Sequence, residues 1–401
     1  MPPTDPPSWS GAQRVSARLV LGAERTLEPG VVSIEGDSIS SAGPLDAGVP
    51  DFEILAPGFV DLQVNGVGAI DVASALGGDW TALGRALLSS GVTTWCPTLV
   101  TAPPEVTSRA CARVARAMAQ ASPELPQIAG VHLEGPLITV PGAHAEQLLA
   151  TSVDGSWVSD LDPPVRIVTL APELPGALTV VSDLSRKGIL VALGHSACTA
   201  EEAHAAAAAG ARLVTHLGNA TGPFHQRKPG LLGAALCDDL LAVSLIADLE
   251  HVHPDVIRLA FAAKTPARVA LVTDAVATIA GTVGPVKLDS GTIPGAAARL
   301  ADGTLAGSSL TMERAVANVT DVAGIPLADS VAAASTTPAA LLGLGDRGAI
   351  AAGLRADLVA LSWDETVERG PAPGPGPGRR RQLRVDAVWL GGRLAWRPAT
   401  V

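Results

Sequence analysis

The sequence predicts an α/β protein: a (β/α)8 barrel of the TIM type with a small β-sandwich domain built from both chain ends. In the middle of the 401-residue chain, short apolar runs alternate with Ala-rich helical stretches. At both ends, short strands of alternating apolar residues flank glycine turns. Strands that alternate with helices indicate a parallel sheet, and eight of them suit a closed barrel. The hydrophobic share of 47% supplies a large core and excludes a disordered chain.

The two chain ends are expected to form the small domain, at residues 13–56 and 350–401. Residues 1–12 are proline-rich and predict a flexible tail, without the basic start and apolar run of a signal peptide. Segment 370–382 contains PAPGPGPG and three arginines, so it cannot pack a core and is expected to be a solvent loop. Alternating apolar residues predict strands at 15–21, 31–34, 38–41, 357–362, 385–390 and 393–396.

The barrel is expected between residues 57 and 349. Its candidate strands are the short apolar runs at 60–63, 93–99, 128–132, 165–169, 191–193, 213–216, 243–246 and 270–272. Between them, helices are expected at 80–89, 104–120, 178–187, 200–209 and 255–263. Several of these helices are rich in alanine, most of all 200–209, which lets them pack closely around the outside of a barrel.

Composition limits the partners and the compartment. A net charge of −11 repels nucleic acid and anionic membranes. The aromatic share of 3% argues against a platform for stacking bases. The four cysteines form no CxxC pair, which favours a reducing cytoplasm, and no stretch of about 18 uninterrupted apolar residues predicts a membrane helix.

Polar residues recur where the predicted barrel strands end, which is where barrel enzymes place their chemistry. They are Gln63 and Asn65 after the first strand, Glu134 after the third, His195 after the fifth, His216 after the sixth and Asp274 after the eighth. A Glu, two His and an Asp on one mouth suit Zn²⁺ or a similar divalent ion. Three protein ligands and one position for water would make the site catalytic.

Taken singly, each of these residues has a structural alternative. A histidine at a strand end is often only hydrogen-bonded, an aspartate after a strand is commonly a helix N-cap, and a glutamate before Gly-Pro can belong to a turn. Their location at the same end of successive strands favours the metal site.

A series of motifs between about residues 55 and 360 resembles the N-acetylglucosamine-6-phosphate deacetylases of the amidohydrolase superfamily. The motifs are PGFVDLQVNG at 57–66, GVTT at 91–94, PTL at 97–99, HLEGP at 132–136, LAPE at 170–173, GHS at 194–196, THL at 215–217, NA at 219–220, RKPG at 227–230, IAD at 246–248 followed by His251, VTDA at 272–275 and LAGS at 305–308. Their shared order makes the resemblance specific.

The resemblance implies one divalent metal per chain, expected to be Zn²⁺, held by Glu134, His195 and His216. It implies that Asp274 is the catalytic acid and base. Amidohydrolases with two metals usually carry His-x-His after the first strand, where this chain has Gln63 and Asn65. Neutral amides are weak Zn²⁺ ligands, so we interpret this pair as a vestigial second metal position. The alternative is that the two amides only close the barrel mouth.

The resemblance also implies a substrate site and a homodimer. Contacts to the sugar phosphate would come from Asn219, Ala220, Arg227 and His251, with Arg227 reaching in from the neighbouring subunit. The pocket for N-acetylglucosamine would be lined by Ala143, His144, Leu305, Ala306 and Gly307. The implied reaction gives glucosamine 6-phosphate and acetate, in amino-sugar catabolism.

Departures from the family pattern define the alternatives. Leu249 stands where a glycine is common, and the acidic Glu250 beside the expected phosphate site leaves open whether the sugar must be phosphorylated. A hydrolase for another N-acyl sugar or a cyclic amide would keep the metal and have no use for Arg227. A non-catalytic binding barrel would have lost one of Glu134, His195, His216 or Asp274, and none is lost.

Overall fold

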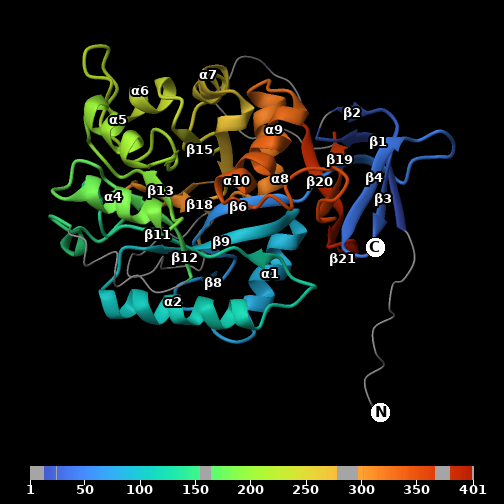
Figure 1. Cartoon of the computed structure of the whole chain (residues 1–401), viewed down its shortest axis with the longest axis horizontal. Helices are drawn as coiled ribbons and strands as arrows, with labels where there is room; N and C mark the ends of the chain where they lie inside the picture. The colour runs from blue at the N-terminus through green and yellow to red at the C-terminus, as the bar shows by residue number, and fades with distance from the viewer. Residues whose placement is uncertain are drawn as a thin grey trace.

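The computed structural model describes residues 13–23, 25–153, 164–277, 297–300, 302–365 and 380–399. It consists of a barrel surrounded by helices and a separate sheet at one side that contains both described chain ends (Figure 1). The predicted tail at 1–12 and residues 370–379 of the predicted solvent loop lie outside the described residues.

The predicted barrel is confirmed as a nearly closed ring of parallel strands. In spatial order they are β6 (Phe59–Val64), β9 (Val92–Val100), β11 (Val131–Glu134), β12 (Val165–Leu170), β13 (Leu190–Leu193), β14 (Leu213–Val214), β15 (Ala242–Ile246) and β16 (Val269–Val272). A short extra strand, β10 (Gln127–Ile128), pairs with β9. The ring closes between β6 and the end of β16 through a bridge from Val64 to Ala275 and a 3.0 Å bond from Asp274 N to Gln63 O.

Two strand boundaries differ from the prediction. The run expected at 128–132 is split into β10 and β11, with Gly130 at φ 138° between them. The strand expected at 213–216 ends at Val214, because His216 takes a left-handed backbone conformation with φ 31°. The backbone at His216 therefore no longer pairs as part of the strand.

Helices surround the barrel, and local sequence explains where several begin. They are α1 (Asp79–Ser89), α2 (Pro104–Ala119), α4 (Ala177–Arg186), α5 (Ala200–Ala209), α6 (Gly230–Cys237), α7 (Pro254–Lys264), α8 (Met312–Ala317), α9 (Leu327–Ala334) and α10 (Thr336–Leu341). Proline at the first position starts α2, and a capping box between Thr199 and Glu202 starts α5. None of the described helices is long and apolar enough to cross a membrane.

The chain ends meet in one mixed sheet. Its order is β21 (Arg393–Trp396), β20 (Gln382–Leu390), β19 (Leu358–Asp364), β5 (Phe52–Pro57), β1 (Gln13–Leu21), β3 (Gly30–Glu35) and β4 (Ser38–Pro44), with β2 (Thr26–Leu27) on β1. This sheet has its own buried core, in which Val32, Leu55 and Trp389 take part. Because β5 leads through Gly58 directly into β6, the sheet is continuous with the first barrel strand.

Two hairpins lie at the barrel mouth. They are β7 (Gly66–Val67) with β8 (Ile70–Asp71), and β17 (Ala297–Arg299) with β18 (Leu305–Ser308). The second hairpin is bonded to the end of the eighth barrel strand, since Ser308 N donates to Asp274 O at 2.9 Å and Val276 N donates to Ser308 O at 2.9 Å. Residues far along the chain thereby reach the mouth.

Gly58, between the sheet and the barrel, has no room for a side chain. A Cβ there would lie 2.4 Å from Cγ2 and Oγ1 of buried Thr93. Gly58→Ala is therefore expected to lower the free energy of unfolding by about 1–3 kcal/mol, the usual cost of overpacking. Denaturant unfolding measures this, and Gly43→Ala is the control because a Cβ at Gly43 meets nothing within 4 Å. Equal stabilities of the two variants would contradict the packing argument.

Candidate active site

Three of the predicted site residues have unusual backbones. His195, His216 and Asp274 follow β13, β14 and β16, with φ values of 48°, 31° and 48°. Residues other than glycine are strained in this left-handed region. Such strain persists only where surrounding contacts impose the conformation. Here the contacts are backbone hydrogen bonds, such as those from Thr139 N and Val140 N to His195 O at 2.9 Å each. With this backbone conformation, all three side chains point toward one place in the barrel mouth.

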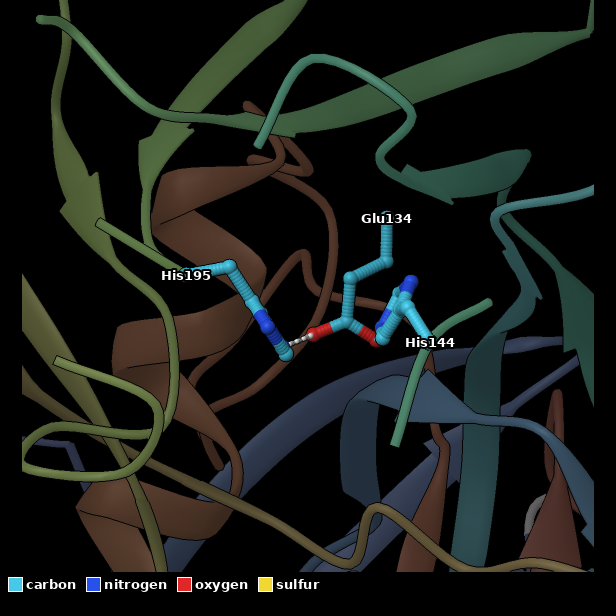
Figure 2. A group of neighbouring side chains, drawn as sticks. All are labelled: Glu134, His144 and His195. Carbon is cyan, nitrogen blue, oxygen red and sulfur yellow. Dashed lines mark ion pairs between the residues drawn. The ribbon is translucent and has the colours of Figure 1, made fainter. Parts of the chain in front are cut away.

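Glu134 lies at the centre of that point. Its Oε1 is 2.8 Å from His216 Nε2 and 3.3 Å from His195 Nε2, and the two Nε2 atoms are 3.1 Å apart. Its Oε2 is 3.9 Å from Nε2 of His144 (Figure 2). All four side chains are at least nine-tenths buried. The structure thus brings together the three predicted metal ligands and adds His144 beside them.

This donor set fits a divalent cation. Glu134 Oε1 and the Nε2 atoms of His195 and His216 lie within 3.3 Å of one another, and among the described residues His144 also offers a ligand atom within 4.8 Å of those of Glu134 and His195. Because Val140 O can only accept, the 2.8 Å contact makes His195 Nδ1 the donor, which leaves Nε2 free to bind a metal. Two imidazoles and a carboxylate facing one another are ligands that Zn²⁺ accepts.

Asp274 and Glu134 are linked by the amide pair. Gln63 Nε2 donates to Glu134 Oε1 at 3.1 Å and to Asp274 Oδ1 at 3.0 Å, and Asn65 Nδ2 donates to the same Oδ1 at 2.7 Å. The two amides therefore hold both carboxylates, a role that goes beyond closing the mouth. Burial and the charge of Glu134 raise the pKa of Asp274 to about 8. Burial opposes the charged form of Glu134, yet hydrogen bonds from His195 and His216 hold its pKa well below the usual value.

His144 is fixed by Thr101. Thr101 N donates to His144 Nδ1 at 3.4 Å, and Thr101 Oγ1 lies 2.8 Å from the same atom. Since Nδ1 accepts from the backbone N–H, the ring proton belongs on Nε2, the atom that faces Glu134. Burial and the charge of His195 lower the pKa of His144 to about 4, so the ring is neutral near pH 7.

A cavity of about 720 Å³ opens above the cluster. Its lining includes most of the predicted substrate residues: Ala143, His144, Asn219, Ala220, His251, Leu305, Ala306 and Gly307. His251 is oriented by Asp248, whose Oδ2 lies 2.6 Å from its Nδ1. Arg227 is exposed on the loop before α6 and is not part of this lining within one chain.

The structure shows how the two unusual residues Glu250 and Leu249 fit into their loop. The carboxylate of Glu250 pairs with Arg299 at 3.3 Å, so its charge is partly compensated. Leu249 takes φ 71°, the conformation that a glycine at this position would adopt without strain.

Sequence reasoning missed Thr101, Asp248 and Glu173 as supporting residues. Asp248 had a local signal, because it lies three residues before His251. Glu173 ends the LAPE motif at 170–173, but that motif does not indicate which residues it contacts, and Thr101 had no signal, because it contacts a loop that is distant in the sequence.

The chain is similar to known proteins over most of its length. The amidohydrolase family matches residues 54–394. The N-acetylglucosamine-6-phosphate deacetylase of Homo sapiens is 36% identical, over 86% of this chain and 83% of the relative. The N-acetylgalactosamine-6-phosphate deacetylase of Escherichia coli O157:H7 is 32% identical, over 94% and 98%.

Solved structures agree with these relatives. The crystal structure of N-acetyl-D-glucosamine-6-phosphate deacetylase from Mycobacterium smegmatis superposes with a TM-score of 0.84 at 31% identity, covering 95% of this chain and 99% of that one. The enzyme of the same name from Thermotoga maritima gives 0.83 at 29% identity, covering 96% and 100%.

Proposed function

Because this chain belongs to the amidohydrolase family, and within it to the N-acetylglucosamine-6-phosphate deacetylases, we propose that it hydrolyses the N-acetyl group of N-acetylglucosamine 6-phosphate. The products are glucosamine 6-phosphate and acetate, in amino-sugar catabolism. The observation that carries the proposal is the contact of Glu134 with His195 and His216 beside buried Asp274, at the floor of a cavity that Asn219 and His251 line.

Glu134, His195 and His216 would hold one divalent metal ion, which we propose to be Zn²⁺. When bound, such an ion activates a water molecule and polarises the amide carbonyl. Asp274 is the proposed general base and acid: Gln63 and Asn65 both bond its Oδ1, so Oδ2 is the atom that we assign to proton transfer. A divalent cation bound beside it would favour its carboxylate form, so that it could take the proton of the water and later deliver it to the leaving amine.

His144 is the proposed donor to the carbonyl oxygen of the substrate. With Nδ1 held by Thr101, its Nε2–H is available, and its neutral form is the one present near pH 7. His251, oriented by Asp248, would bind the sugar phosphate together with Asn219 and Ala220.

N-acetylgalactosamine 6-phosphate, an epimer of the first sugar, is the second candidate substrate. It is favoured by the Escherichia coli relative, which aligns over nearly the whole of both chains. The deciding experiment measures acetate release from both N-acetylamino sugars, each with and without the 6-phosphate, using metal-loaded protein. We expect the highest kcat/KM for N-acetylglucosamine 6-phosphate. A preference for the galactose epimer would select the second candidate, and no release from any of the four sugars would contradict the deacetylase function.

Arg227 is proposed to bind the phosphate in the neighbouring subunit of a homodimer. Its exposure and its place outside the cavity of its own chain are compatible with that role. Loss of a charge-assisted fork is worth about 1.5–3 kcal/mol. Arg227→Ala is therefore expected to raise KM for the phosphorylated sugar about 10- to 100-fold and to leave the unphosphorylated one unchanged.

The neighbouring variant Lys228→Ala is the control for a general loss of positive charge on this loop. Equal effects of Arg227→Ala on both sugars would make Arg227 structural. Mixing Arg227→Ala with Asp274→Asn chains should restore part of the activity, because one site of each mixed dimer then has both groups intact. No recovery in dimers shown to be mixed would contradict a shared site.

A further inference from the structure

We infer that Glu173 is a positioning residue for His195: it shapes the metal site without contacting the metal or the substrate. Glu173 lies after β12, three residues beyond the end of that strand. Its side chain reaches across to the loops after β11 and β13. The inference rests on the proposed role of His195 as a metal ligand.

The carboxylate of Glu173 collects three donors from two different loops. Ala197 N donates to Oε1 at 2.8 Å, and Ser196 Oγ donates to Oε2 at 2.6 Å. Thr139 Oγ1 also donates to Oε1. Ser196 is fully buried, so its hydroxyl depends on this partner instead of on bulk water. Glu173 thereby ties the segment after His195 to the segment around Thr139.

The segment at Thr139 is the one that orients His195. Thr139 N and Val140 N both donate to His195 O at 2.9 Å, and His195 Nδ1 donates to Val140 O at 2.8 Å. Residues 139–140 therefore fix the backbone, the ring orientation and the tautomer of His195 together. Because Glu173 bonds Thr139 on one side and residues 196–197 on the other, it closes this clamp.

The strained backbone makes the clamp necessary. His195 has φ 48°, a conformation that costs free energy unless the surroundings enforce it. In Glu173→Gln an amide NH2 replaces one carboxylate oxygen, so the three donors no longer all have an acceptor, and the chain at His195 can relax toward ordinary strand geometry. Nε2 would then move away from Glu134 Oε1, which now lies 3.3 Å from it. Partners that orient metal-ligating histidines typically change metal affinity 10- to 100-fold when removed.

Glu202 provides a matched control. Its Oε2 accepts from Thr199 N at 2.8 Å in the capping box of α5, so it also satisfies a backbone N–H where a loop meets a helix. It belongs to the same loop-to-helix connection as Glu173's partners, yet it bonds neither residue 139 nor residues 196–197. Glu202→Gln therefore makes the same change from carboxylate to amide at a comparable contact, while the clamp on His195 stays intact.

The test is Zn²⁺ affinity of the full-length, metal-free protein, measured by competition with a chromophoric chelator. Glu173→Gln is expected to weaken Zn²⁺ binding about 10- to 100-fold, and Glu202→Gln to stay within about twofold of the wild type. Tm values of the metal-free proteins, measured in parallel, separate a change at the site from lost stability. Wild-type affinity in folded Glu173→Gln, or equal losses in both variants, would overturn the inference.

A milder variant keeps the test decisive if Glu173→Gln does not fold. Thr139→Val is nearly isosteric and removes one of the three donors, so a smaller weakening of Zn²⁺ binding is expected. Wild-type affinity in that variant would then reject the role of Glu173. The readout needs no substrate, so failure to release acetate from any sugar would contradict the proposed reaction and leave this result standing.

Discussion

Asp274→Asn is expected to lower kcat by about 10²–10⁴ while the protein still binds its metal ion. Loss of a general acid or base typically has an effect of that size. Asparagine keeps an oxygen where Gln63 and Asn65 donate to Oδ1, so the amide pair and the backbone at φ 48° keep their contacts. What is lost is the oxygen that we propose takes and returns the proton.

The measurement is kcat for acetate release with the metal content of the same sample determined in parallel. Asp255→Asn, an exposed aspartate in the first turn of α7, is the control for the substitution itself. Turnover near the wild-type rate in metal-loaded Asp274→Asn would remove Asp274 from the proposed chemistry. A variant that lost its metal would instead indicate that Asp274 stabilises the metal site.

Metal removal is expected to abolish activity, and one equivalent of Zn²⁺ per chain to restore it. Glu134, His195 and His216 would supply three ligands, because their facing atoms surround one point. The Nε2 atom of Gln63 and the Nδ2 atom of Asn65 donate to the carboxylates and therefore cannot ligate a cation. The amide oxygens that remain, among them the unpartnered Asn65 Oδ1, are neutral ligands and weak partners for Zn²⁺.

Elemental analysis of dialysed protein, followed by titration of the chelated protein with Zn²⁺, tests the stoichiometry. Full recovery at one equivalent supports a single ion. Recovery that needs two tightly held ions per chain would show that Gln63 and Asn65 belong to a working second site. Activity that survives complete metal removal would contradict the proposed mechanism as a whole.

The sequence predicted the barrel and the convergence of its polar strand ends because both are periodic and local. Glu134, His195 and His216 each follow an apolar run, and parallel strands bring such ends to the same rim. The amide pair could be recognised as a departure from His-x-His, but its bonds to Asp274 depend on ring closure between β6 and β16.

What the sequence could not predict depends on long-range loop placement. Thr101 and His144 are 43 residues apart, and Glu173 and Thr139 are 34 apart, so no short-range pattern links them. The left-handed backbone of His195 gave no signal either, because only a few per cent of residues other than glycine adopt it and the residue type alone does not mark which ones. For Arg227, one chain alone does not contain the neighbour that the proposed role requires.

The mixed sheet cannot be completed until late in the synthesis of the chain. β5 pairs with β19, with Pro57 opposite Leu358, so about 300 residues must be translated between these partners. At roughly 5–20 residues per second, the ribosome needs about 15–60 s for that stretch. Until then, the edge of β5 that will pair with β19 has unpaired main-chain donors and acceptors. Such an edge can pair with strands of other nascent chains. Ribosome-bound chains halted before β19 should therefore bind chaperones. Chains in which β19 and β20 have emerged should no longer bind them.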